Sequence, residues 1–232
     1  QTATNWCQNL SLLSSGETGL AYPVRAFADR AERLGADADP DARYVSFILS
    51  DGDNVQWLMG NFCRGEEAFQ YYGCPDRGQM PFGWTIPPVD LLQLCPYTLD
   101  YLSENATPQD DFVLLGGGYY YPDHFGEARG DDGSLVQQAR RTARYMTKCN
   151  VRALLVNCED WDSESALRAY ATYAREIPVL RGIFAVQYYP YTGGEGAIRW
   201  VQGADGRRVP VMSARNALWS ERKDHPREGT PS

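Results

Sequence analysis

The sequence has little of what several classes of protein require. Its 22 lysines and arginines are outnumbered by 30 aspartates and glutamates, which gives a net charge of −8, so nucleic acids and anionic membrane surfaces would be repelled. No apolar run approaches the length that spans a bilayer, and Gln1-Thr2-Ala3-Thr4 lacks a charged and apolar leader. We expect neither nucleic acid nor membrane as a partner, and any signal peptide to have been removed or never to have existed.

Several catalytic and cofactor-binding motifs are also missing. Gly116-Gly117-Gly118 does not have the spacing of a P-loop or of a dinucleotide-binding turn, and it leads into Tyr-Pro instead of a helix. Neither of the 2 histidines is accompanied by a Ser-centred nucleophile elbow. These absences disfavour nucleotide binding and a serine or cysteine triad, and we expect His124 to be solvated or hydrogen-bonded.

Six cysteines are spread along the chain without the repeated CxxC pairs that zinc sites use. A zinc site is therefore not expected. Cys63 and Cys74 bracket one loop, so we expect their Cα atoms to lie within ~7 Å of each other. If the protein is exported, we expect a disulfide between these two cysteines. Cys158 lies inside an apolar strand and is expected to be a buried thiol.

The periodicity of the chain predicts an α/β fold. Strands are expected near residues 44, 82, 112, 152, 181 and 209, and helices over 24–34, 89–102 with a break at Pro96, 135–148 and 163–176. Polar and aromatic residues follow nearly every strand, which favours a (β/α) TIM-barrel-like fold of largely parallel strands, incomplete at the carboxyl end. A doubly wound sheet is the alternative. We expect three parts: a lead-in segment (1–43) packed on the barrel, the barrel-like domain (44–219) and a polar tail (220–232).

The stretch from Phe112 to Tyr121 is expected to form a strand that ends in a binding site. The run from Phe112 to Leu115 is continuously apolar, as in a strand covered on both faces, and three glycines end it. Glycines there let a backbone approach a ligand closely. The three tyrosines that follow present flat apolar faces with hydroxyl tips, which suit sugar rings, although a tyrosine-rich turn without a ligand would look the same.

Gly116-Gly117-Gly118-Tyr119-Tyr120-Tyr121-Pro122 resembles the motif that names the GxGYxYP putative glycoside hydrolases, and all five fixed positions match. The Ser50-Asp51-Gly52-Asp53-Asn54 segment supports the resemblance, which extends from about residue 44 to 219. It implies a hydrolase acting on a poly- or oligosaccharide, secreted or placed at the cell surface or in the periplasm. It also implies a barrel-like domain that follows a separate amino-terminal domain in the full-length protein.

Two acidic clusters could supply the pair of carboxyl groups that glycoside hydrolysis needs, usually ~5 to 10 Å apart. Asp51 and Asp53 follow the first strand, where mutual repulsion could raise one pKa. Glu159 and Asp160 follow a buried strand beside an indole, where partial desolvation could keep one carboxyl protonated. Either of the second pair is the candidate proton donor, and we expect Asp51 or Asp53 to face them across a cleft.

Other interpretations of both clusters stay open. The first could be a turn whose carboxylates bond backbone amides, or a divalent-cation site of the Asp-x-Asp kind, as in metal-bound nucleotide sugars. The second could be structural: Asp162 precedes Ser163, the expected cap of the helix that follows, and could itself be a helix cap instead of a ligand group. No other cofactor is expected.

Aromatic and polar side chains at the strand ends would bind the carbohydrate, although core packing is the commoner fate of each aromatic ring taken alone. The same face without a spaced acid pair would be a non-catalytic carbohydrate-binding module. The expected substrate-binding residues are Asn54, Gln56, Trp57, Trp84, Gly118, Tyr119, Tyr121, Asp162, Gln187, Tyr188, Arg215 and Trp219.

Overall fold

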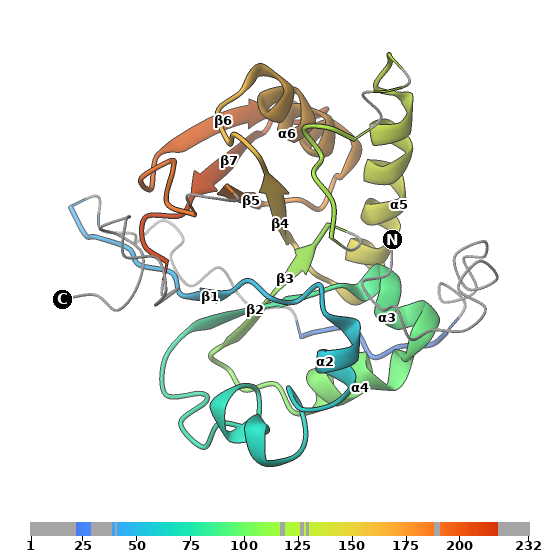
Figure 1. Ribbon diagram of the computed structural model, residues 1–232, viewed down its shortest axis with the longest axis vertical. Helices are drawn as coiled ribbons and strands as arrows, with labels where there is room; N and C mark the ends of the chain where they lie inside the picture. Colours follow the sequence, from blue (N-terminus) through green and yellow to red (C-terminus); the bar gives the residue numbers. More distant parts are fainter. Residues whose placement is uncertain are drawn as a thin grey trace.

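The computed structural model describes residues 22–28, 39, 41–116, 119–125, 128, 130–187 and 191–217. Seven of its strands form one sheet in the order β1-β2-β3-β4-β5-β7-β6 (Figure 1). The first six in this order run parallel, and β6 runs antiparallel to β7 at the edge. The strands are β1 (Ile48–Leu49), β2 (Phe82–Ile86), β3 (Asp110–Leu115), β4 (Ala153–Cys158), β5 (Gly182–Gln187), β6 (Ile198–Gln202) and β7 (Arg208–Ser213).

The expectation of a largely parallel α/β sheet is confirmed, but the TIM-barrel-like arrangement is not, because the sheet is open. Among the described strands β1 pairs with β2 alone and β6 with β7 alone, so the sheet has two open edges. Closure would require the edge at β1 to pair with the far edge, where β6 turns back antiparallel. A doubly wound sheet does not describe the chain either, because β1 to β5 follow one another without the reversal that defines that fold.

Helices follow most parallel strands, and most of the described α-helices begin at a side-chain cap or a proline. Proline occupies the first turn of α3 and of α4, as the break at Pro96 predicts. Ser163 Oγ accepts the Ala166 N–H at 3.1 Å and caps α6. The helices are α2 (Val55–Met59), the 3₁₀ helix η2 (Glu66–Gln70), α3 (Pro88–Leu94), α4 (Pro96–Glu104), α5 (Gly133–Cys149) and α6 (Glu164–Glu176). No described helix is long and apolar enough to cross a membrane.

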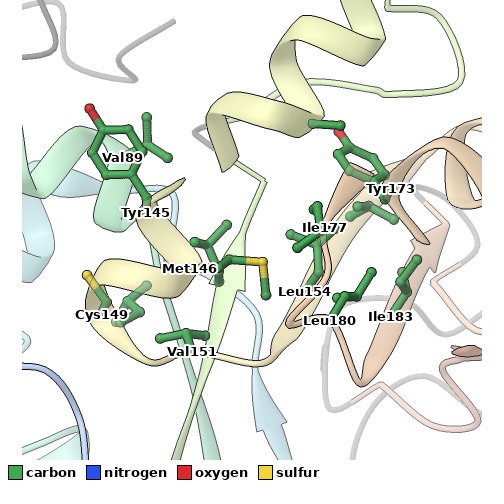
Figure 2. Close-up of a cluster of buried hydrophobic side chains, with 14 of the residues drawn as sticks. Val89, Tyr145, Met146, Cys149, Val151, Leu154, Tyr173, Ile177, Leu180 and Ile183 are labelled. Carbon is green, nitrogen blue, oxygen red and sulfur yellow. The ribbon is translucent and has the colours of Figure 1, made fainter. Parts of the chain in front are cut away.

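The main core lies between the sheet and the helices, which Figure 1 shows grouped on one side of the strands. Figure 2 shows part of it: Met146 of α5 lies beside Leu154 of β4, and Tyr173 of α6 and Ile183 of β5 belong to the same cluster. Alternate residues of the same strands point to the opposite face, where a smaller cluster centres on Leu155. No described helix contributes to that second cluster.

Several local expectations need correction. Residues 24–28 of the predicted helix over 24–34 are not helical, and the rest of it lies outside the described residues. Its Phe27 instead stacks on Phe112 of β3 with ring centroids 3.9 Å apart, while the strand expected from 44 to 50 is confined to β1. Cys63 and Cys74 are both free, so the expected disulfide is absent, whereas Cys158 is a buried thiol as expected.

Candidate active site

The loop that follows β1 carries two aspartates over the end of β2. Gly52 makes this route available, because a Cβ at that position would lie 2.0 Å from the Thr85 carbonyl oxygen. The Gly52 N–H also donates to Thr85 Oγ1 at 2.8 Å, which fixes the loop to β2. Asp51 is exposed and Asp53 is half-buried. Burial raises the pKa of Asp53, and the charge of Asp51 raises it further against the lowering effect of a backbone hydrogen bond.

A second acidic group lies across the ends of the neighbouring strands β3 and β4. His124 Nε2 lies 2.6 Å from Glu159 Oε2, and the Glu159 N–H donates to Asp123 Oδ2 at 2.9 Å. Asp123 is 5% exposed, and its Oδ1 is buried with no hydrogen-bond partner among the described residues. The Glu159 side chain is 73% exposed, so its carboxyl is held at one side and open to a ligand at the other.

The residues after Glu159 organise the start of α6. Asp160 Oδ1 accepts the Asp162 N–H at 3.1 Å, and Ser163, not Asp162, caps the helix. Asp162 forms a two-point ion pair with Arg199 of β6, at 2.8 and 2.7 Å. The same guanidinium lies 5.3 Å from the centre of the buried Trp161 ring. Because each oxygen of Asp162 already accepts from Arg199, its predicted contact with substrate would compete with this ion pair.

The tyrosine run divides between the surface and the core. Tyr119 and Tyr121 are half-buried, their hydroxyl oxygens lie 3.1 Å apart, and their rings meet edge to face at 5.8 Å. Tyr120 points the other way and hydrogen-bonds through its hydroxyl to the Tyr173 hydroxyl of α6. Burial raises the pKa of Tyr120 to about 12. The motif therefore offers two tyrosines to a ligand and uses the third to anchor the loop to the helices.

Several predicted sugar-binding residues have structural roles here. Trp84 is 6% exposed and donates through its indole N–H to Asp110 at 2.8 Å. Asn54 caps α2 by accepting the Trp57 N–H at 2.9 Å, and the Trp57 ring packs edge to face on Phe62 and Tyr71. Trp84 is therefore buried, and the side chains of Asn54 and Trp57 already make contacts within the protein.

The remaining predicted residues lie at or near the same edge. Gln187 ends β5 and accepts the Trp161 N–H at 3.3 Å, while Arg215, which follows β7, is exposed and packs against Gly196. Gln56 is exposed on α2. Gly118, Tyr188 and Trp219 lie outside the described residues.

The two acidic groups share the carboxyl edge of the sheet but do not touch. Asp51 and Asp53 follow β1, whereas Glu159 and Asp160 follow β4, and β2 and β3 lie between these strands. Among the residues that the structure describes, no group of three or more His, Cys, Asp or Glu side chains is arranged to hold a metal ion. The edge therefore provides two separate carboxylate positions with tyrosines between.

Sequence reasoning missed Asp123 and underestimated His124. The available signal was their position directly after the tyrosine motif, but only the pairing of β3 with β4 shows that this loop meets Glu159. It also missed the loop at 191–196, where Glu195 has a φ of 53° and Gly194 packs against Trp161 and Ser213. A non-glycine residue with positive φ is uncommon and often lies near a functional site.

Comparison with known proteins identifies the family. Residues 41–230 match the family described as GxGYxYP putative glycoside hydrolase C-terminal domain. The chain belongs to this family. The resemblance carried by Gly116 to Pro122 is thereby confirmed, although no curated protein matches this GxGYxYP chain.

A solved structure shares the fold of the GxGYxYP domain. It is described as a putative hydrolase from Bacteroides thetaiotaomicron VPI-5482, with 25% sequence identity and a TM-score of 0.67. The similarity covers 97% of this chain but 38% of that one. The chain thus spans well under half of the length of this relative.

Proposed function

We propose that this GxGYxYP domain is the catalytic part of a glycoside hydrolase that cleaves a poly- or oligosaccharide at the carboxyl edge of the sheet. The proposal rests on one observation above all: acidic side chains follow both β1 and β4 at this edge, in a chain whose family and structural neighbour are described as hydrolases. Tyr119 and Tyr121 lie at the end of β3 between them and offer apolar rings with hydroxyl tips.

The two acids take different roles in this proposal. Asp53 is the proton donor, because burial and the neighbouring Asp51 raise its pKa and so favour its protonated form. Glu159 is the base or nucleophile, since its Oε2 lies 2.6 Å from His124 Nε2 and its side chain is 73% exposed. This assignment reverses the expectation that Glu159 or Asp160 supplies the proton.

The strand order suggests a spacing for the pair. Three inter-strand intervals separate β1 from β4, or about 14 Å in a flat sheet. Inverting glycosidases hold their two carboxyl groups farther apart than retaining ones, with a water between base and sugar, so two acids on strands that are not neighbours favour the inverting arrangement. We therefore propose inversion at the anomeric carbon.

The test screens the purified chain against a glycan panel and follows the anomer of the first product by NMR. Asp53→Asn and Glu159→Gln should each lower kcat by about 100-fold or more, because general acid or base catalysis is lost, while glycan binding is retained. Asp111→Asn, an exposed carboxylate at the opposite end of β3, is the matched control and should leave kcat unchanged. Full turnover in both acid variants would refute the assignment.

A non-catalytic carbohydrate-binding module is the second candidate, and the paired Tyr119 and Tyr121 rings favour it. Such a module would bind glycans without cleaving any member of the panel. Tyr121→Ala should then weaken binding by about three- to tenfold, the value of one aromatic contact, and both acid variants should bind normally.

A further inference from the structure

One face of α5 lines a cavity of about 620 Å³ beside the GxGYxYP motif. This volume falls within the range of small-ligand pockets, about 300–1,000 Å³. Most of the polar lining residues lie three or four positions apart along the helix, so they share a face that adjoins the face packed in the core. They are Ser134, Gln137, Gln138, Arg140, Arg141 and Arg144.

The cavity begins at the carboxyl edge of the sheet, where β3 passes into the motif. Gln138 Nε2 donates to the Gly116 carbonyl oxygen at 3.1 Å, directly after β3 ends. Arg141 and Arg144 lie three and six residues further along α5, or about 4.5 and 9 Å along the helix axis. Because α5 returns beside the sheet toward β4 (Figure 1), the cavity extends from the motif along this helix.

An aromatic wall joins the cavity to the proposed catalytic group. Phe125 lines the cavity and packs edge to face on Tyr120 of the motif, with ring centroids 5.2 Å apart. The residue before Phe125 is His124, whose Nε2 lies 2.6 Å from Glu159 Oε2. The cavity therefore adjoins the position proposed for the substrate, as a neighbouring subsite would.

The lining is cationic in a chain that is acidic as a whole. The described lining residues contribute three guanidinium groups and no carboxylate. The net charge of −8 does not cancel this local excess, because charges further away than a Debye length, about 8 Å at physiological ionic strength, are largely screened. An anionic ligand small enough to enter the cavity is therefore favoured there.

Acidic side chains on adjoining elements offset these arginines only in part. Glu176 of α6 accepts from Arg140 Nε at 2.7 Å, which places that guanidinium between the cavity and α6. Asp90 of α3 interacts with the charge of Arg141, but burial raises the pKa of Asp90 to about 7 and so reduces its negative charge near neutral pH.

Guanidinium groups bind carboxylates and sulfate esters through paired hydrogen bonds, and the Gln137 amide can bind sugar hydroxyl groups. We propose that this cavity is a subsite for the anionic group of an acidic oligosaccharide, either a uronic acid carboxylate or a sulfate ester. This inference rests on the proposed function and adds the substrate class to it: the chain acts on an acidic glycan.

Calorimetric titration of two matched ligand pairs tests the subsite. One pair is a galacturonate oligosaccharide and its methyl ester, and the other is a sulfated galactose oligosaccharide and its desulfated form. Every protein in the series carries Asp53→Asn, so that no ligand is consumed. The charged member of at least one pair should bind about tenfold more tightly than its neutral partner, because charge-assisted hydrogen bonds are lost with the charge. The pair that shows the preference identifies the anion.

Substitution of the arginines locates the preference. Arg141→Gln together with Arg144→Gln should reduce it to about twofold or less and leave binding of the neutral ligands unchanged. Arg175→Gln together with Arg181→Gln is the matched control, since both residues are exposed, lie outside the cavity lining and remove the same total charge. Arg144→Gln alone, at an exposed position, should reduce the preference about threefold and tests the site if the double variant does not fold.

Equal binding within both ligand pairs would overturn the proposal, as would a preference that survives the loss of Arg141 and Arg144 or disappears equally in the control. Cleavage by the wild type is scored separately. A preference that depends on these arginines, in a chain that cleaves no glycan, would uphold the subsite and refute the hydrolase. Cleavage of neutral glycans without any preference for the charged ligands would refute the subsite and uphold the hydrolase.

Discussion

The pKa of Asp53 can be changed through its neighbour Asp51. Burial first, and the charge of Asp51 next, raise the pKa of Asp53. A proton donor must be protonated, so kcat/KM should fall as pH rises through that pKa. Asp51→Asn removes the like charge and lowers the pKa of Asp53, and the alkaline limb should move to lower pH. The pH profile of kcat/KM measures this, with Asp111→Asn as control, and a limb that stays or moves up would contradict it.

Asp90, in the first turn of α3, is a buried carboxyl that the proposed mechanism does not use. It is 8% exposed, and burial raises its pKa to about 7 in spite of the opposing charge of Arg141. Between the unfolded value near 3.8 and about 7, the folded state holds a proton that the unfolded chain has released. Stability is therefore highest below the unfolded pKa and falls with rising pH, by at most about 1.4 kcal/mol per unit.

Asp90→Asn cannot ionise and should flatten this slope. Urea unfolding at pH 5, 6, 7 and 8 would measure it, comparing the wild type with Asp90→Asn and with the exposed Asp111→Asn. The free energy of unfolding of Asp90→Asn, relative to that of the wild type, should increase as pH rises. Parallel stability curves for the two proteins would show that Asp90 does not titrate in this range.

At the scale of elements, the β1–α2 loop depends on one glycine. A Cβ at Gly52 would lie 2.0 Å from Thr85 O, so the loop must move away from β2 in Gly52→Ala and carry Asp51 and Asp53 with it. We expect a loss of about 1–3 kcal/mol in stability together with a loss of turnover. Gly182→Ala is the control, since its Cβ would lie 3.4 Å from the flexible end of Met212. Gly52→Ala should lower both the thermal unfolding temperature and kcat more than Gly182→Ala does. Equal effects of the two substitutions would contradict the steric argument.

Elements with strong local signals could be predicted from the sequence. The apolar runs of β3 and β4 and the Ser163 cap of α6 all lie where they were expected. β6 was missed because its Ile-Arg-Trp-Val-Gln sequence is short, largely exposed and confined to an edge. Its Arg199 is explained only by Asp162, 37 residues away, a pairing that no local pattern encodes.

At the scale of the whole molecule, the parallel order could be predicted but not the openness of the sheet. Regular alternation of strands and helices gives βα units, whereas closure depends on whether the first strand meets the last, which is set by long-range pairing. The candidate site divides in the same way. The residue types at strand ends were visible in the sequence, but the contact between His124 and Glu159 required the register of β3 and β4.

The strand order also has a consequence for the newly made chain. Each strand from β2 to β5 can pair with its predecessor as soon as it leaves the ribosome, since these neighbours are consecutive in the sequence. β6 cannot, because its partner β7 is synthesised after it and must insert between β6 and β5. A nascent chain that has reached β6 but not β7 thus presents an unpaired strand and an open β5 edge at once. That interval is when this protein has most need of a chaperone.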